Sequence, residues 1–154
     1  MVRRVARSIL LIIPLLFLAC SDTPKSTVEK MKEKACDRDI QGFFSYIDKS
    51  EVAQNIKKEV LSAPEYKGLG EAILESAMPF MQSQLWQGYE DEIKKGKDGS
   101  ICNIRLLAEK TKENQVLIQF PNGRQQNWGF TKYGDRWLLT SLSLSGDIPI
   151  NSNR

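Results

Sequence analysis

The stretch that decides the fold is residues 115–144, which read QVLIQFPNGRQQNWGFTKYGDRWLLTSLSL. Polar and apolar residues alternate along it with the period of two that is typical of β-strands. Pro121-Asn122-Gly123 and Tyr133-Gly134-Asp135 interrupt the alternation, and turns this short join strands that run antiparallel. The pattern predicts three strands, at residues 115–120, 126–132 and 136–144.

A fourth strand is predicted just upstream. The period is also two over residues 101–110, and Lys112-Glu113-Asn114 form the turn that follows. A meander of this kind cannot expose both faces to water, so other elements must cover one of them. We therefore expect an α+β domain in which N-terminal helices pack on an antiparallel sheet of about four strands.

Helix signals fill the chain before this sheet. Ser26-Thr27-Val28-Glu29 fits a capping box, which predicts a first helix over residues 27–36. Asp39 is suited to cap a second, short helix, and Ser50 a third that Ala63-Pro64 would end. Apolar residues recur at helical spacing behind these caps: Val28, Met31 and Ala35, then Ile40, Phe43, Phe44 and Ile47, then Val52, Ile56, Val60 and Leu61.

A longer amphipathic helix is predicted next. Pro79 lies inside it and removes the backbone hydrogen bond to Glu75, so we expect a kink or a restart there. The apolar residues that recur three and four positions apart are Leu74, Ala77, Met78, Met81, Leu85 and Tyr89.

The composition excludes several classes of enzyme. The chain has 154 residues, 41% hydrophobic and 27% charged, which suits one globular domain. It contains no histidine, so Ser-His-Asp and Cys-His catalysis and histidine-rich metal sites are excluded. Glycine-rich phosphate-binding motifs are also absent from the sequence.

The first twenty residues indicate export and lipidation. Arg3, Arg4 and Arg7 precede an apolar run at residues 9–19, which is shorter than the ~20 residues that a membrane span needs. The run ends in Leu18-Ala19-Cys20, which resembles the lipobox of bacterial lipoproteins. In that family the cysteine thiol receives a diacylglycerol, the signal peptide is cut before it, and the freed amine is acylated.

The resemblance divides the chain into four parts. Residues 1–19 would be the signal peptide, 20–26 the lipidated Cys20 with a short tether, 27–147 the single domain, and 148–154 a frayed tail. Three acyl chains would hold the protein permanently at a membrane. Ser21 stands where an aspartate tends to mark inner-membrane retention, so the resemblance implies the outer membrane, facing the periplasm, if the host is Gram-negative.

The charge of the mature chain argues against nucleic acid as a partner. The sequence has 22 Lys plus Arg against 19 Asp plus Glu, and loss of the three arginines before Cys20 brings both numbers to 19. The net charge is then zero, and no basic stripe remains for a phosphate backbone.

Cys36 and Cys102 are the two cysteines that lipidation does not use. An oxidising compartment favours a disulfide between them, which would close a long loop and stabilise the fold by roughly 4 kcal/mol. Two buried free thiols are the alternative, since spacing alone does not show that the two Cα atoms come within bridging range. The chain has no C-x-x-C motif that would indicate a redox pair.

The order of these features supports a second resemblance. A lipobox, a tether with Pro24, an aspartate-led turn into Phe43-Phe44, and a meander closing on Tyr133-Gly134-Asp135-Arg136-Trp137 resemble lipoproteins of the nuclear transport factor 2-like superfamily. The likeness would cover residues 24–145. It implies a strongly curved sheet wrapped around the helices as a cone, whose open end often holds a pocket. Members include isomerases, dehydratases, and binding or dimerisation modules, so the fold alone does not select a function.

Aromatic residues are the candidates for lining such a pocket. An apolar ligand would be held mainly by hydrophobic side chains with few polar anchors. The alternative is that the same residues form the core between the sheet and the long helix. The candidates are Tyr46, Trp86, Tyr89, Trp128, Phe130 and Trp137.

No catalytic or metal-binding constellation emerges. An isomerase-type site would pair an acid with a tyrosine, but no spacing links Asp39 or Asp48 to Tyr46, Tyr66 or Tyr89, and helix caps explain the acids. Asp37-x-Asp39-x-Gln41-Gly42 with Asp48 only superficially follows a calcium loop, because Gln41 is neutral and Asp48 is short for a bidentate ligand. We predict no metal and no cofactor.

The sequence therefore favours a membrane-anchored envelope lipoprotein with a non-catalytic binding or assembly domain of unknown ligand. The partners it leaves open are the membrane, a small apolar ligand, an envelope protein and a second copy. A small isomerase or hydro-lyase and a structural dimer that uses the exposed sheet face are the alternatives.

Overall fold

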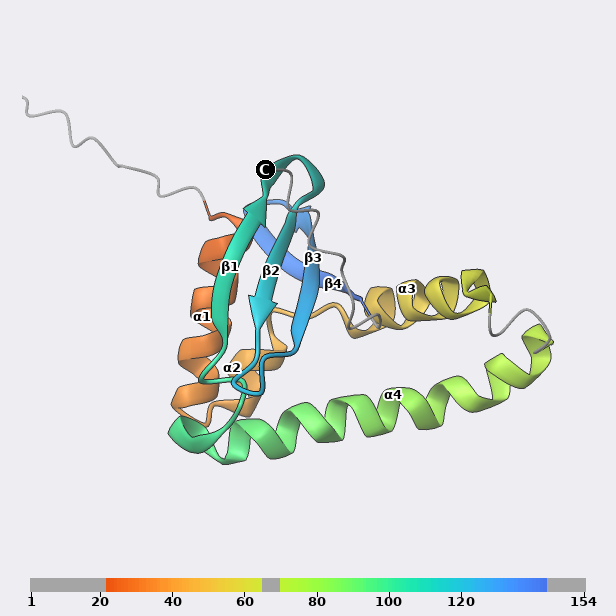
Figure 1. Cartoon of the computed structure of the whole chain (residues 1–154), viewed down its shortest axis with the longest axis horizontal. Coiled ribbons are helices and arrows are strands. Elements are labelled where there is room, and N and C mark those ends of the chain that lie inside the picture. The colour runs from red at the N-terminus through yellow and green to blue at the C-terminus, as the bar shows by residue number, and fades with distance from the viewer. Residues whose placement is uncertain (1–21, 65–69, 144–154) are drawn as a thin grey trace, which may run out of the picture.

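The computed structural model describes residues 22–64 and 70–143 and confirms the α+β class (Figure 1). Residues 1–21, 65–69 and 144–154, which include Cys20 and Tyr66, lie outside the described part. The helices are α1 (Pro24–Cys36), α2 (Ile40–Phe44), α3 (Lys49–Ser62) and α4 (Glu71–Lys94), with short 3-10 turns η2 (Gly96–Asp98) and η3 (Thr111–Glu113). The strands are β1 (Arg105–Lys110), β2 (Gln115–Gln119), β3 (Gln125–Tyr133) and β4 (Arg136–Leu142).

The four strands form one antiparallel sheet in sequence order, as predicted. Gly123 and Gly134 have positive φ in the two predicted turns, where a side chain would be strained. The predicted strand at 101–110 is wrong in its first part, because residues 101–103 lie in turns and β1 begins at Arg105. A bulge at Gly129 and Phe130 in β3 bends the sheet.

Two of the predicted helix starts are wrong. Helix α1 begins at Pro24 and not at residue 27, because the capping box is made by Thr23 and Ser26, whose side chains each accept a hydrogen bond from the other's backbone N–H. Pro24 also suits a first helical position, where no N–H is needed. Helix α3 is capped by Asp48 and not by Ser50: the Asp48 carboxylate accepts from the Glu51 N–H at 3.0 Å. Asp39 caps α2 as predicted.

Helix α4 continues through Pro79. It is a single helix of 24 residues, so the predicted restart does not occur. Packing explains the continuity, because Leu74 and Met78 before the proline and Tyr89 and Ile93 after it all belong to the same buried cluster.

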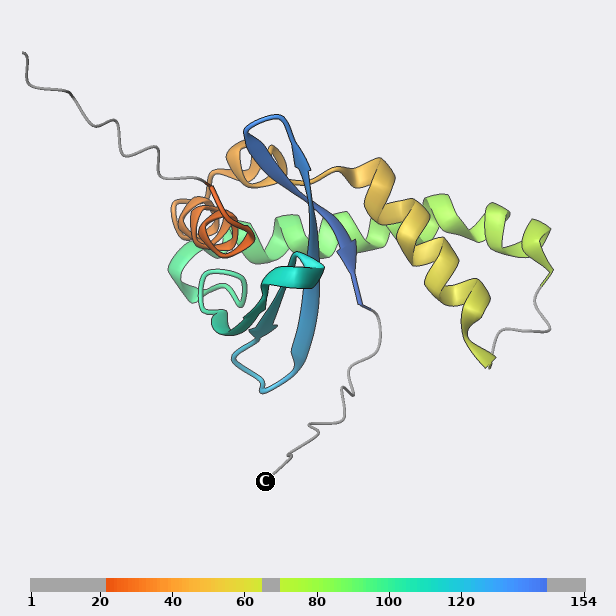
Figure 2. The ribbon, with the colours of Figure 1, turned by 90° about the horizontal axis from the view of Figure 1, so that it is seen from above.

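The core lies between the helices and one face of the sheet. Val28 and Met31 of α1, Phe43 of α2 and Ile93 of α4 are fully buried, together with Trp128 of β3. Figures 1 and 2 show that α3 and α4 both extend beyond the sheet, on the side of the domain away from α1. The body of the domain therefore carries a projecting hairpin of two helices.

The Cys36–Cys102 disulfide is confirmed. It joins the last residue of α1 to the turns that precede β1, with the two Cα atoms 4.8 Å apart. The predicted helical half and the predicted strand half are thus linked covalently.

The fold begins inside the predicted tether. The Trp137 indole N–H donates to the Asp22 carbonyl oxygen at 2.7 Å, and the Asp22 carboxylate pairs with Lys30 at 2.6 Å. In the sequence, Ser21 alone lies between Asp22, which these contacts hold in the fold, and Cys20. Within residues 22–64 and 70–143, no helix is long and apolar enough to cross a membrane.

Candidate functional site

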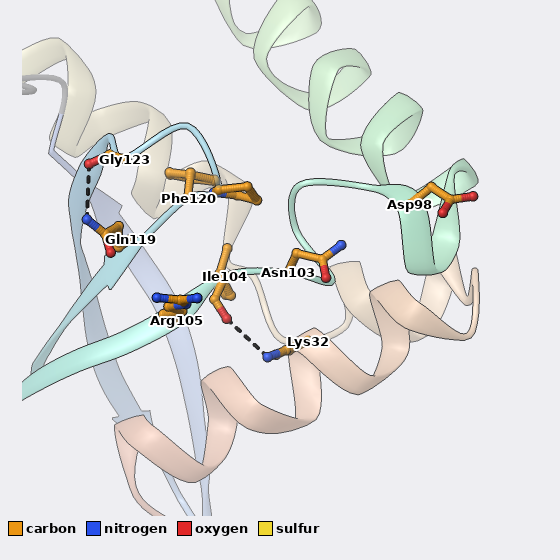
Figure 3. Close-up of a pocket in the computed structure, with 9 residues that line it drawn as sticks. Lys32, Asp98, Asn103, Ile104, Arg105, Gln119, Phe120 and Gly123 are labelled. Atoms are coloured by element: carbon orange, nitrogen blue, oxygen red, sulfur yellow. Dashed lines mark hydrogen bonds between the residues drawn. The ribbon is translucent and has the colours of Figure 1, made fainter.

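A polar hollow of about 610 Å³ opens at the end of the sheet where β1 begins (Figure 3). The turn between β2 and β3 forms one wall, and the middle of α1 with the loop before β1 forms the other. The lining residues are Lys32, Asp98, Asn103, Ile104, Arg105, Gln119, Phe120, Pro121 and Gly123.

Two cationic side chains lie on either side of Ile104. The Lys32 ammonium donates to the Ile104 carbonyl oxygen at 3.0 Å, which fixes its position and leaves two of its three N–H groups free to donate elsewhere. Arg105 follows Ile104 at the start of β1 and is exposed. Among the described residues, neither cation forms an ion pair with a carboxylate. The lining thus carries the two positive charges of Lys32 and Arg105 and the single negative charge of Asp98, which leaves it with a net positive charge.

The remaining wall is partly apolar, and its polar side chains are held by contacts with neighbouring groups. The Gln119 amide donates to the Gly123 carbonyl at 3.3 Å across the turn, and the buried Phe120 ring lies beneath the Arg124 guanidinium, 4.9 Å from its centre. The Asn103 amide N–H₂ is held by the carbonyl oxygens of Lys97 and Gly99. A ligand with an anionic group and an apolar body would match this lining.

A smaller pocket of about 250 Å³ lies on the other side of Phe120. Leu85, Gly88 and Tyr89 of α4 line it together with Glu92 and Ser100. Burial raises the pKa of the Tyr89 hydroxyl, which stays protonated. The Glu92 carboxylate contacts Lys95 and accepts from the Ser100 backbone N–H at 2.6 Å. It therefore ties the end of α4 to the loop that leads into the polar hollow.

Replacing Glu92 with glutamine is expected to destabilise the protein by about 1 kcal/mol at pH 7. The hydrogen bonds from Lys95 and Ser100 lower the pKa of Glu92 from 4.5 to about 2. A lowered carboxyl pKa stabilises the fold above the unfolded value of 4.5, and this stability is lost as the pH falls towards 2. Urea unfolding at pH 7 and pH 2.5 should thus show a difference between the wild type and Glu92→Gln that shrinks with acid.

The predicted aromatic candidates lie together, but in the core. Trp128, Phe130 and Tyr89 are buried, and Tyr46, Trp86 and Trp137 are half-buried against the same cluster. The ring centres of Tyr89 and Trp128 are 6.4 Å apart, and those of Trp86 and Tyr89 are 6.0 Å apart. Tyr89 borders the smaller pocket and Trp86 a groove between α3 and α4, and none of the six lines the polar hollow.

The acids considered for catalysis serve the helices. Asp39 and Asp48 cap α2 and α3, and the Lys34 hydrogen bond lowers the pKa of Asp39. Of the tyrosines in the described ranges, Tyr46, Tyr89 and Tyr133, none hydrogen-bonds to a carboxylate. No group of three or more potential ligands suitable for a metal ion occurs in that part of the chain either.

Sequence reasoning missed the residues of the polar hollow. They come from α1, η2, the loop before β1, the facing ends of β1 and β2 and the turn after β2. Apart from the buried Ile104 and Phe120, each is an ordinary exposed or half-buried residue in its own segment. Comparison of the chain with protein-family models, curated proteins and solved structures found no match.

Proposed function

We propose that the protein is a membrane-anchored envelope lipoprotein whose folded domain binds a small organic anion without transforming it. The observation that carries the binding role is the polar hollow, where Lys32 and Arg105 lack carboxylate partners among the described residues. The lipobox-like Leu18-Ala19-Cys20 supports the anchor, which in a Gram-negative host would lie in the outer membrane. No observation favours the isomerase alternative.

The proposed anchor would direct the hollow away from the lipid. The Lys25 N–H donates to Glu109 near the end of β1, so the start of α1 lies beside that end, whereas the hollow surrounds Arg105 at the strand's beginning. The six residues of β1 separate the two ends by about 17 Å. Because Cys20 and Asp22 are at most ~7 Å apart along the chain, the end with Asp22 would lie against the membrane surface and the hollow would face the aqueous compartment.

Cys20→Ser is expected to abolish acylation and membrane attachment. The hydroxyl cannot form the thioether that the proposed lipid requires, so the variant should lose incorporation of an alkyne fatty acid and move from the membrane to the soluble fraction. The double variant Cys36→Ser/Cys102→Ser is the matched control and should keep the label, because the two sulfurs that it removes are used in the disulfide and neither is the proposed lipid acceptor. Equal labelling of the Cys20→Ser variant and the wild type would refute the anchor.

Binding is tested by titrating the polypeptide from Ser21 to Arg154 with benzoate, followed by ¹H–¹⁵N NMR. Shift changes should centre on residues 103–105 and 119–124, because the carboxylate would lie between the two cations and the ring on Phe120. The double variant Lys32→Gln/Arg105→Gln should weaken binding at least about 10-fold. Lys132→Gln, near the opposite end of the sheet, is the control. Scattered shifts that the double variant leaves unchanged would refute the site, and inorganic phosphate in place of benzoate tests the need for an apolar body.

A further inference from the structure

The exposed large apolar side chains of the described residues concentrate on the projecting hairpin. Ile73, Phe80 and Met81 of α4 are 58%, 68% and 40% exposed, and Leu61 near the end of α3 is 37% exposed. In residues 22–64 and 70–143, the exposed large apolar side chains of the sheet are those of Leu107 and Tyr133. The described part of the hairpin thus exposes more large apolar side chains than the sheet does.

Two of these side chains, Ile73 and Phe80, belong to a stripe along the side of α4 that faces away from the core, whereas Met81 lies on the flank of the helix and Leu61 on α3. Leu74, Met78 and Tyr89 turn inwards. On the opposite side of the helix, residues recur at intervals of three and four, the heptad spacing with which one helix packs along another. These residues, Ile73, Ser76, Phe80, Ser83 and Gln87, are the outer stripe. Figure 1 shows no described element beyond α4 on the side away from α3.

The outer stripe is almost free of charge. No Asp, Glu, Lys or Arg occurs over residues 76–89, and Glu75, just before this stretch, is paired with Lys57 of α3 at 2.8 Å. A charged partner would find no complementary group there, and an anionic lipid surface would find no cation. The proposed anchor would also hold the membrane near the start of α1, and α1 lies on the other side of the domain from the hairpin (Figure 1).

We propose that the outer stripe is the interface of a homodimer in which α4 packs antiparallel against α4 of a second copy. A two-fold axis at Phe80 would set Phe80 beside Phe80 of the second copy and Ile73 opposite Gln87. Ser76 and Ser83 flank Phe80 on its own helix, so each ring enters a space between small side chains. Ile73 then faces a neutral amide, the two Phe80 rings face each other, and no like charges meet along the outer stripe.

The contact is limited in size, which sets the expected affinity. Helix α4 has 24 residues and is therefore about 36 Å long, but only its first two thirds carry the outer stripe. A contact of this length lies at the small end of the size range of specific protein interfaces. We therefore expect a weak dimer, with a dissociation constant in the micromolar range. This dimer does not depend on a ligand in the polar hollow, nor on lipidation.

Sedimentation of the polypeptide from Ser21 to Arg154 over a range of micromolar concentrations tests the dimer. We expect a concentration-dependent shift from monomer to dimer, and Phe80→Ser should weaken association at least tenfold while the circular dichroism spectrum stays unchanged. Tyr133→Ser removes an exposed aromatic residue outside the outer stripe and should leave association unchanged. A monomer at all concentrations, or a dimer that Phe80→Ser leaves intact, would overturn the proposal.

Cross-linking tests the two-fold axis itself. Phe80→Cys should form a disulfide-linked dimer under mild oxidation at least ten times faster than Tyr133→Cys, because the axis sets residue 80 beside its own copy. Equal rates for the two variants would overturn the antiparallel arrangement. The unacylated polypeptide from Ser21 to Arg154 is also mixed with neutral phosphatidylcholine vesicles. If it pellets with them and its Phe80→Ser variant does not, a lipid surface and not a second copy occupies the outer stripe.

Discussion

Replacing Trp128 with alanine is expected to lower the free energy of unfolding by about 3–5 kcal/mol. The side chain is fully buried where the sheet meets α4, opposite Val116 and Leu142 on the neighbouring strands and 6.4 Å from the Tyr89 ring. Alanine would leave a cavity among these groups and remove the 3.0 Å hydrogen bond from the indole N–H to the Gln126 side chain. Urea denaturation followed by far-UV circular dichroism at pH 7 measures the loss.

Two control variants separate packing from general damage. Trp128→Phe keeps an aromatic ring and should cost less, about 1–2 kcal/mol, mainly for the smaller volume and the lost hydrogen bond. Tyr133→Ala removes a side chain that is 45% exposed and should stay within about 0.5 kcal/mol of the wild type. A loss below about 1 kcal/mol for Trp128→Ala would show that the indole does not fill a close-packed core.

The sheet could be predicted from the sequence because one of its faces is buried. Val116 and Ile118 of β2 point into the core and are fully buried, while the alternate residues Gln115, Leu117 and Gln119 are half-buried. This burial imposes the period of two that the sequence displays. Gly123 and Gly134 mark the turns for a similarly local reason, since both adopt the positive φ that favours glycine.

The helix starts were harder to predict because several residues compete for each cap. Thr23 and Ser26 can both cap α1, and Asp48 and Ser50 can both cap α3, so composition alone does not choose between them. Contacts distant in the sequence favour the earlier residue in each case. Asp22 is tied to Trp137, and the Asp48 N–H donates to the Leu139 carbonyl at 3.0 Å, so each chain segment is already placed when its helix begins.

The polar hollow could not be predicted because tertiary packing assembles it. Lys32 reaches the Ile104 carbonyl across 72 positions of sequence, and no local pattern encodes that contact. The aromatic residues were ambiguous for a different reason. Large aromatic side chains such as Trp128 and Tyr89 are typical both of ligand pockets and of hydrophobic cores, so residue type alone does not separate the two. Burial distinguishes the two, and it is a property of the fold.

Replacing both Cys36 and Cys102 with serine is expected to lower the free energy of unfolding by roughly 4 kcal/mol. The disulfide spans 66 positions, so in the chain-entropy model its loss releases a long closed loop in the unfolded state. It also removes the covalent link between the end of α1 and the turns before β1, which position Lys32 and Asn103 at the hollow. The melting temperature should fall by about 10–20 °C, measured by circular dichroism.

Reduction of the wild type supplies the matched comparison. Dithiothreitol should lower the free energy of unfolding of the wild type to nearly that of the double variant, because it reduces the disulfide. It should leave the double variant unchanged, because that variant has no Cys36–Cys102 disulfide to reduce. The double substitution is preferable to a single one, since a lone thiol at position 36 or 102 could cross-link two chains. If the oxidised wild type and the double variant unfold at the same urea concentration, the bond does not restrict the unfolded chain, and the helices and sheet hold together by packing alone.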